Sequence, residues 1–215
     1  MQKSILSFFI FFIFFVPISA QKGKLMPDFH KSKRDALRSK MPANSVAVLF
    51  ANPLRNRAND VDYVYHPDPN FYYLTGFKEP QAVLVIFKNP QKDDEGFYSD
   101  QLFIQERNAR AEQWNGYRLG LEGSMALGID RISLRSKFVN NPLDFTSFNE
   151  VLIFDFKNDV RNDKNDPYDL YDLQQTFKES INYPRDFNRL RHQLLRRIRT
   201  VKVENTEKLK NIIRW

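Results

Sequence analysis

Residues 60–87 carry the strongest local pattern in the chain, DVDYVYHPDPNFYYLTGFKEPQAVLVIF. Two apolar runs, residues 71–74 and 82–87, are separated by glycine, glutamate and proline, which is typical of neighbouring strands joined by a turn. The stretch also holds more aromatic and charged side chains than a strand pair needs for its core. We therefore expect this segment to form part of a sheet and to contribute to a functional site.

Short apolar runs of single-strand length recur along the chain. Further strands are expected at residues 45–51, 101–105 and 150–156. Helices are expected at residues 28–41, 186–199 and 206–215, where apolar residues recur at helical spacing. Strands that alternate with helices favour an α/β domain with a mixed central sheet flanked by helices.

Local signals also predict several boundaries. Asp28 is the expected N-cap of the first helix, whose basic residues are expected to face solvent. Residues 88–99 predict a polar surface loop within a hairpin, and residues 106–120 predict a loop with one short helical turn. Ser133 is the expected cap of another short helix.

The first 20 residues have the pattern of a signal peptide. Lys3 is followed by a nearly continuous apolar run at residues 5–16, and small residues precede Gln21. The run is short for a membrane span, which needs about 20 apolar residues. We therefore expect export to the periplasm or outside the cell, with no membrane span after cleavage; an uncleaved N-terminal anchor is the alternative.

Composition argues against several self-contained chemistries. The 215-residue chain suits one domain or slightly more, and it has no cysteine, so it forms no disulfide and offers no thiol nucleophile or thiolate ligand. No Gly-x-Ser-x-Gly nucleophile elbow and no phosphate-binding loop occur. A net charge of +7 is weak support for a nucleic-acid or polyamine partner, because the basic residues of the helix at 186–199 are more typical of a solvated face.

Metal ligands are also sparse in the sequence. The three histidines are residues 30, 66 and 192, and no two of them have ligand spacing. Asp60 and Asp62 could place two carboxylates on one side of an extended segment. Ion pairs with the nearby Arg55 and Arg57 explain these two aspartates more simply, so no metal site and no catalytic residue are predicted within the chain.

Trp114 lies in the polar segment ERNARAEQWNGYRLG. A large apolar side chain in such a loop is costly to expose. Two interpretations remain open: the side chain fills part of the core, or it is an anchor at an interface.

Several segments, taken together, resemble a known family in the same order. They are the F-x-x-x-x-R-x-x-L at residues 29–37, the strand SVAVLFA, the block D-x-x-Y-x-Y-x-x-x-x-x-F-Y-Y-L-T-G-F-x-E-P-x-A-V-L, and the later W-x-G-x-x-L-G. This pattern resembles the N-terminal domain of aminopeptidase P, in the creatinase and prolidase group of metallopeptidases. The resemblance is good over residues 28–160 and looser over 161–205.

The resemblance implies a fold related in shape to ribonuclease H over residues 28–185. Residues 186–215 resemble the linker and the truncated start of a catalytic domain. In the family that domain binds two metal ions, usually manganese, through two aspartates, a histidine and two glutamates, and it removes an N-terminal residue that precedes proline. Those ligands would follow residue 215, so we expect this chain alone to bind no manganese and to hydrolyse nothing.

The resemblance also implies roles for two residues. Asp60 matches an aspartate near the N-terminus of the peptide substrate, and Trp114 matches a tryptophan that reaches a neighbouring subunit's active site. We therefore expect the substrate-access and oligomerisation domain of an exported Xaa-Pro aminopeptidase, a family whose substrates are peptides with proline in second position. The domain is expected to form a homo-oligomer and to have no nucleic-acid partner. The alternative is a catalytically inactive binding or regulatory module that dimerises or caps a full-length partner.

Overall fold

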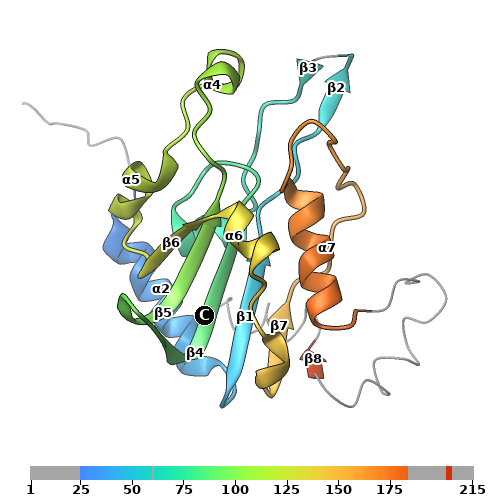
Figure 1. The fold of residues 1–215 in the computed structure, drawn as a ribbon. Coiled ribbons are helices and arrows are strands. Elements are labelled where there is room, and N and C mark those ends of the chain that lie inside the picture. Colours follow the sequence, from blue (N-terminus) through green and yellow to red (C-terminus); the bar gives the residue numbers. More distant parts are fainter. Residues whose placement is uncertain (1–24, 60, 184–201, 205–215) are drawn as a thin grey trace, which may run out of the picture.

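The computed structural model describes residues 25–59, 61–183 and 202–204 (Figure 1). Six strands form one mixed sheet in the order β6-β5-β4-β1-β7-β8, and helices cover both of its faces. This architecture confirms the predicted α/β fold with a flanked mixed sheet. The strands of the sheet are β1 (Ser45–Phe50), β4 (Val83–Asp93), β5 (Gly96–Ile104), β6 (Arg131–Leu134), β7 (Glu150–Ile153) and β8 (Lys202–Glu204). The helices are α2 (Pro27–Lys40), α3 (Pro69–Thr75), α4 (Ala109–Asn115), α5 (Gly120–Ser124), α6 (Arg135–Asn140) and α7 (Leu170–Ser180), with 3-10 turns η1 (Met125–Leu127) and η2 (Phe145–Ser147).

Strand directions bring several strand ends to one edge of the sheet. β1 runs antiparallel to β4 and parallel to β7, while β5 runs antiparallel to β4 and parallel to β6. The carboxyl ends of β1, β5, β6 and β7 therefore meet at the upper edge in Figure 1. The small hairpin of β2 (Asn56–Ala58) and β3 (Val61–Asp62) projects beyond the same edge.

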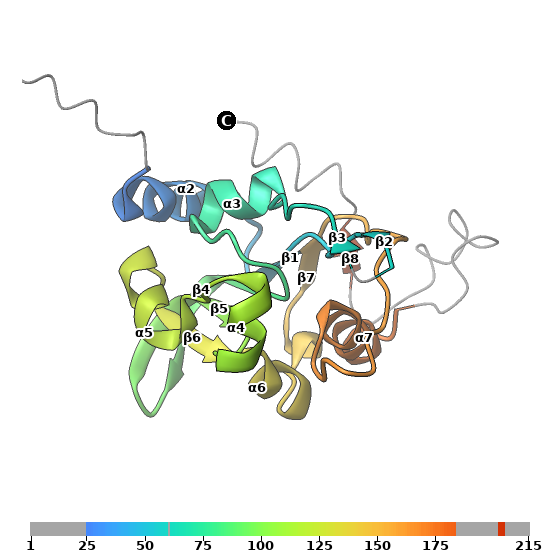
Figure 2. The same ribbon diagram turned by 90° about the horizontal axis from the view of Figure 1, so that it is seen from above.

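Alternating residues of the central strands build two separate cores. In β1, Ala47 and Leu49 face α2 and α3, whereas Val46 and Val48 face α6 and α7. Figure 2 shows the two helix pairs on opposite sides of the sheet. Each fully buried aliphatic or phenylalanine side chain stabilises the fold by about 1.5–3 kcal/mol relative to exposure, so both cores fix the sheet that carries the upper edge.

The prediction of a strand at residues 71–74 is wrong, because these residues lie in helix α3. Asp68 is the N-cap and accepts hydrogen bonds from the backbone N–H groups of Asn70 and Phe71, and Pro69 occupies the first turn. Gly76 ends the helix in the left-handed conformation at φ 70°. These start and stop signals outweigh the strand preference of the aromatic residues.

Helix α2 is confirmed, but its expected cap and its expected solvated face are not. Met26 is the N-cap, Pro27 opens the first turn, and Asp28 lies inside the helix. His30 and Arg34 are buried, so the basic residues do not all face solvent. The buried stripe runs along one helical face because residues four or three apart lie above one another.

Several expected boundaries shift in the structure. The strands expected at residues 45–51, 82–87, 101–105 and 150–156 are present. However, β4 continues to Asp93 and β5 begins at Gly96, so only two residues of the predicted loop at 88–99 lie between them. Leu134, not Ser133, is the N-cap of α6. Helix α7 was not predicted.

Some expectations fall outside the described residues. These are the signal peptide at 1–20, Asp60, and the helices at 186–199 and 206–215. Within the described ranges no helix is long and apolar enough to cross a bilayer.

Candidate functional site

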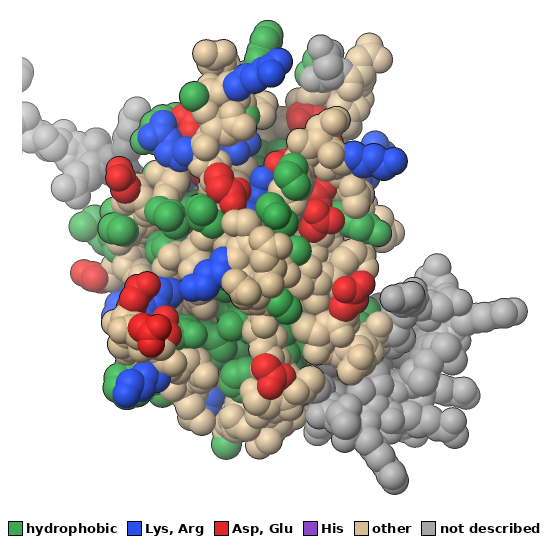
Figure 3. All heavy atoms as spheres, viewed as in Figure 1, with side chains coloured by type: hydrophobic (Ala, Val, Ile, Leu, Met, Phe, Trp, Pro, Cys, Tyr) green, Lys and Arg blue, Asp and Glu red, His purple; other side chains and the backbone are tan. Residues whose placement is uncertain are grey.

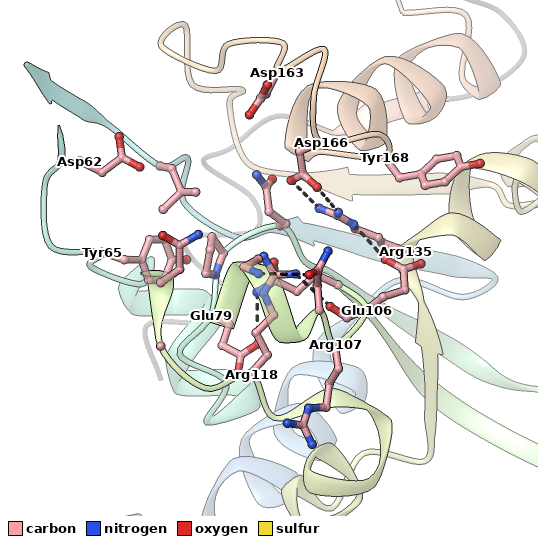
Figure 4. A pocket seen from close by; sticks show the side chains of 18 of the residues that line it. Asp62, Tyr65, Glu79, Glu106, Arg107, Arg118, Arg135, Asp163, Asp166 and Tyr168 are labelled. Carbon is pink, nitrogen blue, oxygen red and sulfur yellow. Dashed lines mark hydrogen bonds and ion pairs between the residues drawn. The ribbon is translucent and has the colours of Figure 1, made fainter. Parts of the chain in front are cut away.

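A cleft of about 920 Å³ opens at the upper edge of the sheet, where the carboxyl ends of the strands meet. One side is formed by β3 and the residues after it, and the other by the loop before α7, with the strand ends and the α4 segment between them. Figure 3 shows acidic and basic side chains side by side at this end of the molecule. In Figure 4, Asp62 and Tyr65 lie on one side and Asp163, Asp166 and Tyr168 on the other.

The β2–β3 side is held by contacts that differ from the predicted ion pairs. The Arg55 guanidinium donates to Asp159 at 2.7 Å, and the carboxylate of Asp62 instead accepts from the Asn56 amide at 3.3 Å. The backbone N–H of Tyr63 donates to the carbonyl of Arg55 at 2.8 Å. The expected pairing of Asp62 with Arg55 is therefore wrong, since a partner 104 residues away takes the arginine.

Helix α4 is a short projection with no buried residue. Asn108 caps it by accepting from the backbone N–H groups of Arg110 and Ala111. The Arg107 guanidinium donates to both carboxylate oxygens of Glu112, at 3.0 and 2.8 Å. This projection is therefore stabilised by a local cap and one ion pair and not by packing against the core.

The same arginine ties the projection to the chain that follows it. The Arg107 guanidinium lies 4.4 Å from the centre of the Tyr117 ring, at cation–π distance. Gly120 has φ 62°, and a β-carbon there would lie 2.7 Å from Cγ of Arg107. Arg107 thus contacts both ends of the α4 segment, and a side chain at residue 120 would displace it.

The floor of the cleft is an ion-pair network around one buried arginine. Arg135, the first residue of α6, is only 4% exposed, and its guanidinium donates to both oxygens of Asp166. Glu106 lies 3.4 Å from Nε of Arg135 and accepts from the Ser136 hydroxyl at 2.8 Å. These contacts join the end of β5, the start of α6 and the loop before α7.

Glu79 ties the α3–β4 connection to the start of α5. Its carboxylate accepts from the backbone N–H of Leu119 at 2.6 Å and from the Gln105 amide at 3.3 Å. The Arg118 guanidinium donates to the carbonyl of Glu106 at 2.9 Å. The charged groups on this side of the cleft are therefore occupied by protein partners.

The protonation equilibria of Tyr65, in the cleft, and of Glu112, on the α4 projection, are displaced from their ordinary ranges. Burial raises the pKa of the Tyr65 phenol, so this side chain stays protonated at working pH. The hydrogen bonds from Arg107 lower the pKa of the Glu112 carboxyl. Neither shift creates a general base near neutrality.

The described residues do not fit the manganese pair that the family resemblance implies. Among them no group of three or more His, Cys, Asp or Glu side chains is arranged to hold a metal ion. His30 is buried, and its Nδ1 lies 2.9 Å from the carbonyl of Tyr73. No metal-dependent step follows from these residues.

The structure describes one of the two predicted substrate residues, Trp114. Trp114 is 85% exposed on α4, so the interpretation as a core side chain is wrong. Asp60 lies outside the described residues. Sequence reasoning missed Tyr65 and the pair of Arg135 with Asp166, because 31 residues separate that arginine from its partner and no local pattern joins them.

Comparisons with known proteins agree with this geometry. Residues 30–139 match the family described as "Aminopeptidase P, N-terminal domain". Intermediate cleaving peptidase 55 of Schizosaccharomyces pombe is 36% identical over 132 residues, which cover 58% of this chain and 26% of that protein. The Xaa-Pro aminopeptidase of Escherichia coli is 40% identical over 100 residues, which cover 46% of this chain and 22% of that protein.

Solved structures show the same fold over most of the chain. Pseudomonas aeruginosa aminopeptidase PepP matches with a TM-score of 0.60 and 27% identity, over 77% of this chain and 34% of that one. Aminopeptidase P from E. coli with the inhibitor Pro-Leu matches with a TM-score of 0.57 and 28% identity, again over 77% and 34%. The chain thus spans about a fifth to a third of the proteins it matches. With a family match that covers half of its length, the chain belongs to the aminopeptidase P family, of which it contains the N-terminal domain.

Proposed function

We propose that this domain forms one wall of the substrate opening in an exported Xaa-Pro aminopeptidase, which removes an N-terminal residue that precedes proline. The carrying observation is Trp114, presented at 85% exposure on a projection that contributes nothing to the core. A tryptophan held in solvent by dedicated local contacts is typical of a residue that meets a ligand or a partner.

The proposed chemistry belongs to a metal-binding half that acts with this domain. That half would hold two manganese ions, which would supply an activated water for attack on the peptide bond before proline. We expect the 215-residue chain alone to give no turnover of an Xaa-Pro peptide with added manganese. Turnover that copurifies with the chain would contradict this division of roles.

A chimera tests the proposed role directly. The corresponding domain of the E. coli Xaa-Pro aminopeptidase is replaced by residues 25–183 of this chain, and hydrolysis of an Xaa-Pro peptide is measured with manganese. We expect activity in the chimera and a loss of about tenfold or more in kcat/KM with Trp114→Ala, since one lost anchor is worth about 1–2 kcal/mol. A folded chimera without activity would favour the inactive binding module.

We also propose that Trp114 acts across a subunit boundary in a homo-oligomer, while Asp60 lies near the N-terminus of the peptide substrate. Sedimentation of the purified chain should give a species larger than a monomer, and Trp114→Ala should weaken it. Phe97→Ala is the matched control, because Phe97 is also an exposed aromatic residue, 73% accessible, near the start of β5 at the opposite end of the sheet. Equal effects of both substitutions would contradict a specific role for Trp114.

Export is proposed from residues 1–20 alone. A reporter enzyme fused after residue 24 should be processed and secreted in a bacterial host. Replacing two phenylalanines of the apolar run with aspartate should retain the fusion in the cytoplasm.

A further inference from the structure

Asn115 and Gly116 form the one Asn-Gly pair in the sequence. Asn115 is the last residue of α4, and Gly116 is the C-cap of this helix. Asparagine is one of the thermolabile residues of proteins, because its side-chain amide can react with the backbone nitrogen of the residue that follows it. A glycine in that following position has no β-carbon to shield the nitrogen.

Both residues are exposed on the α4 projection, which stands away from the body of the domain in Figure 1. No residue of α4 is buried. A β-carbon added at Gly116 would meet no atom of the described residues within 4 Å, so the peptide bond between Asn115 and Gly116 is open to solvent. The backbone itself requires glycine here, since the φ of 85° at Gly116 is strained for other residues.

Asn108, at the other end of α4, is held in a way that Asn115 is not. The side-chain oxygen of Asn108 accepts hydrogen bonds from the backbone N–H groups of Arg110 and Ala111, at 3.0 and 3.1 Å. Among the described residues, the side chain of Asn115 has no hydrogen-bond partner. It can therefore rotate toward the backbone nitrogen of Gly116.

One backbone hydrogen bond restrains that nitrogen. The N–H of Gly116 donates to the carbonyl of Glu112 at 3.1 Å. The Glu112 carboxylate is in turn bound by the Arg107 guanidinium. Because α4 buries no residue, opening its last turn breaks few contacts, and such segments open at the low end of the local stability range.

We propose that Asn115 is a site of spontaneous deamidation, and that the reaction proceeds as the last turn of α4 opens. The backbone nitrogen of Gly116 forms a bond to Cγ of Asn115 and loses its proton to solvent, while the side-chain nitrogen takes up a proton and leaves as ammonia. Water then opens the cyclic imide to give aspartate or the β-linked isoaspartate. The net reaction consumes water, releases ammonia and needs no other reactant.

The product changes the end of α4 that carries Trp114. A carboxylate replaces a neutral amide beside the last carbonyl groups of the helix, where negative charge is unfavourable. Isoaspartate also lengthens the main chain by a methylene group between Trp114 and Gly116. Deamidation therefore loosens α4 and leaves Trp114 less firmly held. This one-way change goes beyond the proposed substrate opening, and it requires neither manganese nor a second copy of the chain.

The test is peptide mapping of the whole chain by mass spectrometry during incubation in mildly alkaline buffer. We expect Asn115 to convert at least about tenfold faster than Asn108, because the Asn108 side chain is held and the residue after it has a β-carbon. Isoaspartate at residue 115 is detected by enzymatic methylation of its carboxylate. Conversion of Asn115 no faster than that of Asn108 would overturn the proposal.

Two variants should change the rate in opposite directions. Arg107→Ala removes the partner of Glu112 and should speed conversion by about 2- to 5-fold, the effect of one exposed ion pair on local opening. Gly116→Ala strains the cap and loosens α4, but its β-carbon shields the nitrogen, so conversion should slow. Both variants should fold, as circular dichroism checks, because α4 buries no residue. Faster conversion with Gly116→Ala would show that opening of α4 alone sets the rate and would overturn the role of the Asn-Gly pair.

The effect on α4 is measured by the fluorescence anisotropy of Trp114 in a Trp215→Phe background, where it is the single tryptophan. Asn115→Asp should give a lower anisotropy than Asn115→Gln, which keeps an uncharged amide. The aged chain should show the same decrease. Equal anisotropy in the two variants would refute the loosening of α4. The activity of the freshly prepared chimera does not depend on these outcomes, so this proposal and the proposed function are tested separately.

Discussion

Arg34 and Arg135 are both buried arginines, but their surroundings differ. Arg34, in α2, is 0% exposed, and its three nitrogens donate to Asp100, to the carbonyl of Leu74 and to the carbonyl of Gly128. Arg135, at the cleft, is 4% exposed and leaves Nε without an acceptor among the described residues. A fully satisfied buried charge joins elements of the fold, whereas Arg135 keeps one donor whose nearest carboxylate, that of Glu106, lies at an ion-pair distance of 3.4 Å.

Asp100 is the centre of the satisfied region. One carboxylate oxygen accepts from Arg34 at 2.8 Å and from Arg38 at 3.0 Å, and the other accepts from the backbone N–H of Asp130 at 2.8 Å. These bonds connect α2 with β5 and with the turn before β6. The network carries no unmatched group that would call for a ligand.

The largest expected effect comes from breaking this network. Asp100→Ala leaves Arg34 buried without its counter-ion and should lower the free energy of unfolding by about 3–5 kcal/mol, measured by urea denaturation. Asp35→Ala is the control: Asp35 pairs with Arg38 at the surface and should cost less than about 1 kcal/mol.

A loss below about 1 kcal/mol with Asp100→Ala would show that water enters the region and solvates the arginine. The contrast between the two arginines would then fail. If Asp100→Ala prevents folding, Asp100→Asn, which keeps the acceptor oxygen and removes the charge, should restore a measurable transition below that of the unsubstituted chain.

The contact between α2 and α3 provides the next test. A β-carbon at Gly76 would lie 2.8 Å from the ring of His30, which is buried and bound to the Tyr73 carbonyl. Gly128 has a similar left-handed conformation, φ 65° against 70°, but its β-carbon would meet Pro27 at an ordinary 3.4 Å. Gly76→Ala should therefore destabilise by about 1–3 kcal/mol more than Gly128→Ala, as measured by thermal unfolding. Equal decreases in stability for the two variants would mean that the His30 ring can move away from the new β-carbon without an energetic penalty. This region would then be less rigid than its hydrogen bonds indicate.

Sequence patterns predicted the sheet much better than they predicted the cleft. The central strands β1 and β4 are continuous apolar runs, and a run of that length has few alternatives to a buried strand. Helix α7 was missed although Asp169 caps it and Leu173 and Phe177 share one face, because Gln174 interrupts the apolar pattern. The start of α7 can therefore be predicted from its capping residue, but its buried face cannot be predicted from the apolar pattern.

The cleft has no comparable local signal. Tyr65, Arg107 and Arg135 meet there only because several strands end at the same edge of the sheet. Burial of Arg34 was likewise unpredictable, since its partner Asp100 is 66 residues away. Charged residues are mostly exposed, and only the tertiary fold shows which one is buried beside a counter-ion.

The ion pair of Arg107 with Glu112 provides a smaller and local test. With Trp215→Phe in the background, Trp114 is the single tryptophan, and its fluorescence anisotropy reports the mobility of α4. Arg107→Ala should lower this anisotropy with little change in the unfolding midpoint, because α4 buries no residue. Arg110→Ala is the control, since Arg110 lies on the same helix with no side-chain role in this pair.

The same pair predicts a pH dependence. Arg107 lowers the pKa of Glu112 below its ordinary value of 4.5, so the ion pair is complete above that value and is lost as the pH falls through the lowered pKa. The anisotropy of Trp114 should fall over that acid range in the Trp215→Phe chain and stay flat with Glu112→Gln. If the anisotropy decreased equally in the Trp215→Phe chain and in the Glu112→Gln variant, the transition would belong to another titrating group.

The smallest expected effect concerns Trp114 itself. Because its side chain is 85% exposed and α4 contacts no core, Trp114→Ala should change the free energy of unfolding by no more than about 0.5 kcal/mol. Phe177→Ala, which truncates a buried aromatic residue of α7, should cost about 3–5 kcal/mol under the same conditions. If Trp114→Ala were as costly as Phe177→Ala, the tryptophan would have to be buried in solution against a partner or a second copy. In that case the exposed position of Trp114 on α4 would contribute to the stability of the fold, and the two could not be changed independently.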